Sequence, residues 1–442
     1  MNRLRKKLPL IATLAGWLAV IAIYVVVMAS IQSKSSDFFT FKQLLKPRLV
    51  DVIVVNWFIY VGCSIGSFLN VVAWRMPRGQ EISGGSRCAR CANKLKVRDN
   101  FPVLGWISLL GRCRYCSLPI SRRYPIVEAL VGLSLMLVGV TQLYWIALPL
   151  PEQLLAYIEW EGGPLWAPRG SPTVIYIVSY HFIALSSLWA MALIRIDGGT
   201  LPNSLRAFSM ITLVLPMLIL PVAMIVPWQT TRGVEWVPDG RYAEAPIRLI
   251  TALVAAAFFA RVLARSLCPR ADLKLDPLGK DSSRLIDLIL MLAIPSVLIG
   301  WQSMPAVVVV ATLLSLLVRP VVNWIPINDL PKGQIQSRGA LEYFSFALPV
   351  VLTFHLTCWR PLWRSGYWPS DISSPSVIMA WAVAALLIPS LVPSDPVAPA
   401  IPPVMEDDDE EEEGEEDENE TTSADELPDQ QRDPETDDGN QR

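Results

Sequence analysis

Charged side chains and histidine are both scarce in this chain. Of its 442 residues, 18% are charged and 52% are hydrophobic, a balance that excludes disordered, fibrous and ordinary soluble single-domain proteins. Its two histidines, His181 and His355, are too few and too scattered for a histidine-rich metal centre. Internal repeats, nucleotide-binding glycine loops and nucleic-acid modules are also missing from the sequence. The composition therefore predicts a membrane protein with no nucleic-acid partner, and any catalysis must use Asp, Glu, Ser, Cys or Lys.

The net charge of −2 hides a separation of charge along the chain. Residues 406–442 hold 20 of the 40 acidic residues and 2 of the 38 basic ones, so this stretch carries −18 and the rest +16. Such a like-charge block cannot bury apolar area, and we expect a disordered acidic tail behind a proline-rich linker. A solvated tail without a partner is the favoured interpretation. Docking onto a basic surface is the minority alternative.

Ten apolar runs are suited to a bilayer, whose hydrocarbon core needs about 20 residues per helix. They predict an all-α polytopic membrane protein with about 8–10 transmembrane helices. The first run is interpreted as an anchor, because it is too long for a cleaved signal and no small-residue cleavage pattern follows it. The runs are 9–31, 51–73, 124–150, 173–195, 206–228, 247–263, 285–300, 304–325, 341–358 and 375–392.

Basic residues beside the runs predict their orientation. Four of them lie within residues 3–7, ahead of the first run, which places the N-terminus in the cytoplasm. Alternation then puts the loop 74–123 on the same side, with eleven basic residues against Glu81 and Asp99. The C-terminus falls on that side too. We therefore expect a multi-pass protein of the inner membrane with both termini cytoplasmic.

Four of the seven cysteines form two Cys-x-x-Cys pairs in this basic loop. Cys88 and Cys91 are separated by 21 residues from Cys113 and Cys116. Each pair can supply two thiolates to one tetrahedral site, which predicts a closed, structural four-cysteine zinc site in a ribbon-like loop. Disulfides are the alternative, and they are disfavoured because the loop is expected in a reducing compartment.

The residues around these cysteines resemble the amino-terminal domain of type IV prepilin peptidases. The similarity extends over about 65 residues and joins a helix end, the two cysteine pairs and the start of the next helix. It is carried by Gly66-Ser-Phe-Leu-Asn70-Val-Val-Ala-Trp-Arg75-Met-Pro77, by Arg98-Asp-Asn-Phe-Pro-Val-Leu-Gly-Trp106, by Gly111-Arg-Cys113-Arg-Tyr-Cys116 and by Pro119-Ile-Ser-Arg-Arg-Tyr-Pro-Ile-Val-Glu128.

This resemblance implies an aspartyl endopeptidase that cleaves the leader of prepilins or pseudopilins at the cytoplasmic face of the membrane. It also implies N-methylation of the new terminus with S-adenosylmethionine. Gly66, Asn70, Arg75 and Glu128 are the candidate cofactor-binding residues. Helix packing, interhelical hydrogen bonding and snorkelling explain the first three equally simply, and we favour packing.

The family cuts with two aspartates at the cytoplasmic ends of membrane helices, and Asp197 is the first candidate. It stands in Leu193-Ile-Arg195-Ile-Asp197-Gly-Gly-Thr-Leu-Pro-Asn203, which resembles the family's motif of an aspartate followed by Leu-Pro-Asp. Without a gap, Arg195 falls on the catalytic position, and Asn203 replaces the usual acid. An ordinary Asp-Gly turn is the alternative interpretation.

Asp287 is the second candidate. It lies thirteen residues before Gly300-Trp-Gln302, close to the spacing of the family's second motif, although Ile286 and Ile289 replace motif residues. The alternative is an ordinary acid near a helix N-terminus. Asp272, in Asp-Leu-Lys-Leu275, is the rival for this role.

The sequence thus predicts five parts and a membrane enzyme acting on prepilins. The leading alternative is an inactive relative that serves as a membrane scaffold or assembly partner, and a transporter ranks low. The parts are an extra anchor and loop at 1–50, the prepilin peptidase N-terminal domain at 51–130, an aspartyl peptidase core at 131–340, C-terminal helices at 341–392, and the linker and tail at 393–442.

Overall fold

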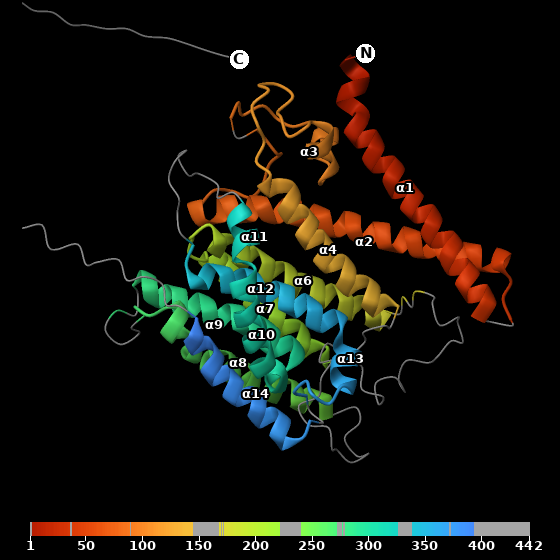
Figure 1. The fold of residues 1–442 in the computed structure, drawn as a ribbon. Helices are drawn as coiled ribbons and strands as arrows, with labels where there is room; N and C mark the ends of the chain where they lie inside the picture. The colour runs from red at the N-terminus through yellow and green to blue at the C-terminus, as the bar shows by residue number, and fades with distance from the viewer. Residues whose placement is uncertain are drawn as a thin grey trace, which may run out of the picture. The chain divides into compact units, whose positions relative to one another are not determined.

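In the computed structural model, helices make up most of the described residues, and no strand occurs among them (Figure 1). These residues are 2–35, 38–88, 90–144, 168, 170, 172–221, 240–271, 276, 279–325, 338–370 and 373–392. The longer helices are α1 (Asn2–Ser35), α2 (Phe41–Arg75), α4 (Arg123–Leu143), α6 (Pro172–Ile196), α7 (Asn203–Ile219), α8 (Gly240–Leu267), α9 (Lys280–Ile299), α10 (Met304–Leu317), α12 (Ala340–Thr357) and α14 (Pro375–Leu387). Shorter elements are η1 (Met76–Arg78), η2 (Val97–Asp99), α3 (Leu104–Ser108), η5 (Trp301–Ser303), α11 (Arg319–Trp324), α13 (Trp359–Arg364) and η6 (Ile388–Leu391).

Each of the ten predicted apolar runs coincides with a helix, which confirms the predicted fold class. Seven helices are long and apolar enough to cross a membrane, and three shorter apolar helices, around α7, α10 and α14, accompany them. The structure divides the predicted run 304–325 into α10 and α11, because Pro320 in the first turn of α11 starts a new helix. It also ends α7 at Ile219, and residues 222–239 lie outside the described part of the chain.

Helix α6 lies at the centre of the bundle and packs against α2, α4, α7, α9 and α12. In its most apolar stretch 78% of the residues are buried, against 6% in α1, which lies at the edge and packs chiefly on α2. Near its C-terminal end, residues 188–196 are all buried. A helix that is apolar on every side requires such a position. The end of α6 is therefore held firmly by its neighbours.

Glycines bring α2 and α4 into close contact. A Cβ atom on Gly62 would lie 2.9 Å from the Cα of Gly132, and one on Gly132 would lie 2.3 Å from the Sγ of Cys63. Gly66 faces Glu128 in the same way, at 2.9 Å from its Cα. Small residues spaced four apart are the usual means by which membrane helices approach each other. This contact fixes the ends of α2 and α4, and the loop between them.

Several loops and helix ends contact one another at one end of the bundle. A Cβ on Gly199, after α6, would lie 3.9 Å from Pro77, which follows α2. The backbone N–H of Leu201 reaches Asp287 in α9, and Arg338, before α12, donates to the carbonyl of Ile196 at 3.1 Å. The cysteine loop and the end of α6 thus lie at the same end of the molecule.

Candidate functional site

Asp197 leaves the end of α6 in a tight glycine turn. Gly198 has a φ of +74°, a left-handed conformation that suits glycine, and its N–H donates to the carbonyl of Arg195 at 2.8 Å. The predicted Asp-Gly turn is therefore present. It does not exclude a functional role, because the Asp197 side chain points back into the bundle rather than closing the turn.

Arg123, the first residue of α4, binds the Asp197 carboxylate with both of its terminal nitrogens, at 2.6 and 2.8 Å. The arginine side chain is fully buried, and that of Asp197 is 15% exposed. Burial raises the pKa of Asp197 above its ordinary value, and the Arg123 guanidinium opposes this shift. Sequence reasoning missed Arg123 as a partner, because it is separated from Asp197 by 74 positions.

Asp287 lies well inside α9, not in its first turn. The helix begins at Lys280, five residues before the predicted apolar run, so Asp287 is about two turns in. It is fully buried, and a contact with the helix N-terminus does not explain it. The alternative of an ordinary acid at the helix N-terminus therefore does not fit Asp287, and its catalytic role stays a prediction.

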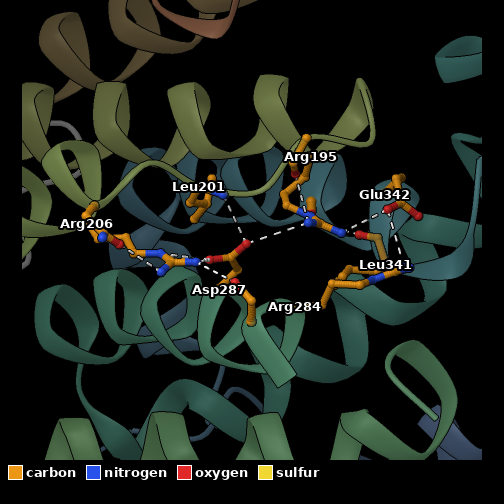
Figure 2. A network of polar contacts seen from close by, with 11 residues as sticks. Arg195, Leu201, Arg206, Arg284, Asp287, Leu341 and Glu342 are labelled. Carbon is orange, nitrogen blue, oxygen red and sulfur yellow. Dashed lines mark hydrogen bonds and ion pairs between the residues drawn. The ribbon is translucent and has the colours of Figure 1, made fainter. Parts of the chain in front are cut away.

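The Asp287 carboxylate is surrounded by donors (Figure 2). Arg206 of α7 donates from Nη2 at 2.6 Å and from Nε at 3.1 Å. Leu201 donates its backbone N–H at 3.2 Å, and Arg195 of α6 forms an ion pair at 3.6 Å. These contacts join α6, α7 and α9 around the Asp287 carboxylate, which accepts from a charged guanidinium and from a backbone N–H.

Arg195 connects Asp287 to a further acid, Glu342 in the first turn of α12. The distance from Arg195 to Glu342 is 3.1 Å, and Arg284 reaches the same carboxylate oxygen at 3.4 Å (Figure 2). Arg195 also donates to the carbonyl of Gly199 at 2.9 Å. Arg195 is therefore buried and pairs with two carboxylates. It is also the residue that an ungapped alignment places at the position of the first catalytic aspartate.

The two predicted catalytic aspartates lie at the same end of neighbouring helices, but each has its own arginine partners. Asp197 is bound by Arg123, and Asp287 by Arg206 and Arg195. The arrangement differs from a pair of facing carboxyls that share one proton. The rival candidate, Asp272, lies outside the described residues.

The four cysteines of the basic loop come together. Their sulfur atoms all lie within 4.8 Å of one another. The two pairs form matching turns, in which the N–H of Ala92 donates to the carbonyl of Cys88 and the N–H of Ser117 to that of Cys113, both at 2.9 Å. The Sγ of Cys88 lies 3.9 Å from that of Cys116.

This sulfur cluster fits a tetrahedral metal ion. Zinc–sulfur bonds of about 2.3 Å in a tetrahedron place the sulfur atoms a little under 4 Å apart. Backbone N–H groups of Cys116 and Tyr115 lower the pKa of Cys113 to about 7, which favours the thiolate form that binds metal. The predicted grouping of the four cysteines is confirmed, and their donor set is that of a structural zinc site.

Three of the four candidate cofactor-binding residues meet where α2 faces α4. Glu128 accepts a hydrogen bond from the backbone N–H of Val103 at 2.6 Å, beside Gly66. Asn70 donates to the carbonyl of Gly66 at 3.4 Å, and its buried amide oxygen has no hydrogen-bond donor among the described residues.

Arg75, the fourth candidate, points away from this interface and donates to the carbonyls of Glu81 and Ser83 in the loop. Gly66 has the packing role that the sequence favoured.

Comparison with known proteins gives a family match within the first third of the chain. The model of the bacterial peptidase A24 N-terminal domain family matches residues 60–142. The sequence resemblance to the type IV prepilin peptidase family is thereby confirmed.

Individual relatives support this result. A prepilin leader peptidase/N-methyltransferase of Myxococcus xanthus is 51% identical over 78 residues, which are 17% of this chain and 23% of that protein. A type 4 prepilin-like proteins leader peptide-processing enzyme of Escherichia coli is 43% identical over 95 residues, 17% of this chain and 35% of that protein. These matches thus span about a quarter and a third of the two relatives. No solved structure matches the chain.

One match extends into the helical core. A prepilin leader peptidase/N-methyltransferase of Burkholderia pseudomallei is 26% identical over 324 residues, which are 66% of this chain and 86% of that protein. The similarity therefore includes helices beyond the cysteine domain, at a lower level of identity.

Proposed function

We propose that this chain, which carries the amino-terminal domain of the type IV prepilin peptidase family, is an inner-membrane aspartyl endopeptidase. It would cleave the leader peptide of type IV prepilins or pseudopilins at the cytoplasmic face. The observation that carries the proposal is the position of Asp197 and Asp287 on neighbouring helices, at the end of the bundle that also holds the cysteine loop. Similarity to a named prepilin leader peptidase over 66% of the chain supports it.

The unequal surroundings of the two acids suit different roles. Asp197 is buried beside one arginine and its pKa is raised, so it can hold a proton and donate it. Asp287 is held in place by two arginines and a backbone N–H, and in this proposal it orients the attacking water. Arg206, whose side chain is 21% exposed, is the partner that a bound peptide can most readily displace from Asp287.

Zinc would be held by Cys88, Cys91, Cys113 and Cys116, and its contribution is structural, because four protein ligands leave no open position. N-methylation of the new terminus, with S-adenosylmethionine as the methyl donor, is proposed as a second step. Glu128 and the free amide oxygen of Asn70 are the polar groups available to that cofactor at the α2–α4 interface.

A second function is favoured by one specific observation. Arg195 bridges Asp287 and Glu342 in a fully buried contact, at the position that an ungapped alignment assigns to the first catalytic aspartate. A guanidinium there would suit a relative that binds prepilins but does not cut them, acting as a scaffold or assembly partner. The two functions differ in a single measurable respect, which is peptide-bond cleavage.

A prepilin cleavage assay with purified full-length chain distinguishes these functions. We expect wild-type cleavage, with at least a hundredfold loss in Asp197→Asn and in Asp287→Asn and no change in Asp276→Asn, an exposed control. Cleavage that survives both substitutions but fails in Asp272→Asn would move the second role to the rival aspartate. Binding of a prepilin by the wild type without any cleavage would establish the second function instead.

A further inference from the structure

The ends of α8 and α14 line an open cavity that the proposed peptidase chemistry does not use. Its volume is about 840 Å³. Phe258, Arg261, Val262 and Arg265 of α8 line one wall, and Leu386 of α14 and Val392 line the other. The hydroxyl of Ser266 donates to the carbonyl of Pro389 at 2.7 Å and joins α8 to η6 beneath the cavity. The cavity is therefore a built feature of two connected helix ends.

Two arginines face this cavity, and no acid among the described residues pairs with them. Arg261 and Arg265 are one helical turn apart on α8 and both are exposed. Neither forms a hydrogen bond or an ion pair through its side chain with any other residue that the structure describes. The residues that line the cavity include no acid. Like charges at this spacing repel each other, so an anion held between them would stabilise the helix end.

The position of the pair in the bilayer favours one source of anion. Both arginines lie in the last two turns of the apolar stretch Glu244–Leu267, the depth at which a membrane helix meets the headgroup layer. Phe258, one turn further into the helix, is 54% exposed, and Leu386 across the cavity is 50% exposed. A ligand that fits has a phosphate at one end and an acyl chain at the other.

We propose that this cavity binds an anionic phospholipid, with its phosphate between Arg261 and Arg265 and an acyl chain along Phe258 and Leu386. Arginine forks bind phosphate oxygens in pairs, and basic pockets between membrane helices are suited to acidic headgroups. The site is separate from the aspartates, so the proposal stands whether or not the chain cleaves prepilins.

The test is native mass spectrometry of the full-length chain released from nanodiscs that contain equal parts of phosphatidylglycerol and phosphatidylcholine. We expect one phosphatidylglycerol to remain bound to the wild type. In Arg261→Gln/Arg265→Gln its affinity should fall roughly tenfold to thirtyfold, since each basic side chain near an anionic surface contributes about a factor of five. The control is Arg112→Gln/Arg270→Gln, which removes the same charge from exposed residues outside the cavity.

Three results would overturn the proposal: equal retention of both lipids, equal retention by the cavity variant and the control, or displacement of phosphatidylglycerol by millimolar glycerol phosphate. The last would assign the cavity to a soluble phosphate compound. If the double glutamine variant does not fold, Arg261→Lys/Arg265→Lys replaces it. That variant keeps the charge but loses the paired donors, and weaker retention of phosphatidylglycerol is expected.

Discussion

At the scale of single residues, the arginines determine how the acidic site behaves. Arg195 is 2% exposed, and it contacts Asp287, Glu342 and the carbonyl of Gly199. Removing a charge from water costs several kcal/mol, and the cost is offset only when partners surround the charge. Removing Arg195 would therefore leave two buried carboxylates with one partner fewer each.

We predict that Arg195→Leu lowers the free energy of unfolding by about 3–5 kcal/mol, the usual effect of breaking a buried ion pair. Adding Glu342→Leu should restore part of this loss, because the second substitution removes one of the unpaired charges. Unfolding in detergent, followed by circular dichroism, measures both. Arg98→Leu is the control, since its side chain is 66% exposed and a change below about 0.5 kcal/mol is expected. Equal effects at Arg195 and Arg98 would contradict the prediction.

The ion pair of Asp99 with Arg114 in the cysteine loop should make the stability of the chain depend on pH. Arg114 donates to its two carboxylate oxygens at 2.5 and 2.8 Å, and these hydrogen bonds lower the pKa of Asp99 below its ordinary value. The pKa of Asp99 in the unfolded chain is about 4, and above that pH the ion pair contributes its full stability. The contribution is lost as the pH falls below about 4 and through the lower pKa of Asp99 in the folded chain.

Asp99→Asn should therefore lower the melting temperature of the chain at pH 7, by an amount that stays nearly constant down to about pH 4 and shrinks as the pH falls below it. The effect is about 1 kcal/mol, because Arg114 is 39% exposed and water screens the pair. Thermal unfolding across this pH range tests it. A difference between Asp99→Asn and wild type that is constant with pH would rule out the ion pair as its cause.

At the scale of elements, the contact between α2 and α4 depends on glycine. Gly62 and Gly66 are four residues apart and face Gly132 and Glu128, so both helices approach closely along one stripe. The backbone, rather than a flexible side-chain end, lies opposite Gly62, and neither helix can make room without moving.

Gly62→Val should consequently destabilise the chain by about 1–3 kcal/mol, the typical cost of overpacking a core. Gly16→Val in α1 is the matched control, because a Cβ atom there has nothing within 4 Å. Unfolding in detergent measures both variants, and the prediction fails if they are equally stable.

The burial pattern of the cysteine loop explains why we expect a bound metal to stabilise it. Between residues 76 and 122, the described residues that are buried are Asp99, Gly105, Gly111 and Cys113, so the segment has almost no hydrophobic core of its own. A loop that buries so little apolar surface folds only if something else holds it, and structural zinc supplies about 10–16 kcal/mol in comparable peptides.

We expect one zinc ion per chain by elemental analysis, and its loss in Cys88→Ser. Cys358→Ser is the control, since this cysteine is in α12's terminal region, outside the cluster. Removing zinc with a chelator should expose residues 76–122 to protease and leave the helical core intact. An equal zinc content in both serine variants would disprove the assignment.

The sequence was sufficient for the elements and for the cysteine cluster, but not for the partners of the acids. The length of an apolar run predicts a membrane helix such as α6 from local composition. The spacing within two Cys-x-x-Cys pairs likewise predicts that their four sulfur atoms can reach one metal ion. The contacts of Asp197 with Arg123 and of Asp287 with Arg206 join residues 74 and 81 positions apart. Such pairs depend on how helices pack, which one sequence does not specify. The predicted domain boundaries remain predictions.

At the scale of the whole molecule, the separation of charge implies an orientation. If each of the ten apolar helices crosses the membrane, alternation predicts that the start of α1, the cysteine loop, Asp197 and the end of α14 lie on one side. The basic residues of that loop predict that this side is the cytoplasm. The connection between α13 and α14 must then face the opposite side. Thr200 and Ser374, both exposed, lie in these two regions and can report on them.

In a Cys358→Ser background, Ser374→Cys should react with a membrane-impermeant thiol reagent in spheroplasts. Thr200→Cys should react only after the membrane is permeabilised, because it follows Asp197 on the cytoplasmic side. The reagent's access depends on the side of the membrane alone, so the two positions serve as controls for each other. Labelling of Thr200→Cys in intact spheroplasts would invert the orientation. It would also remove the proposed peptidase from the face where prepilin leaders are expected, whatever the state of Asp197 and Asp287.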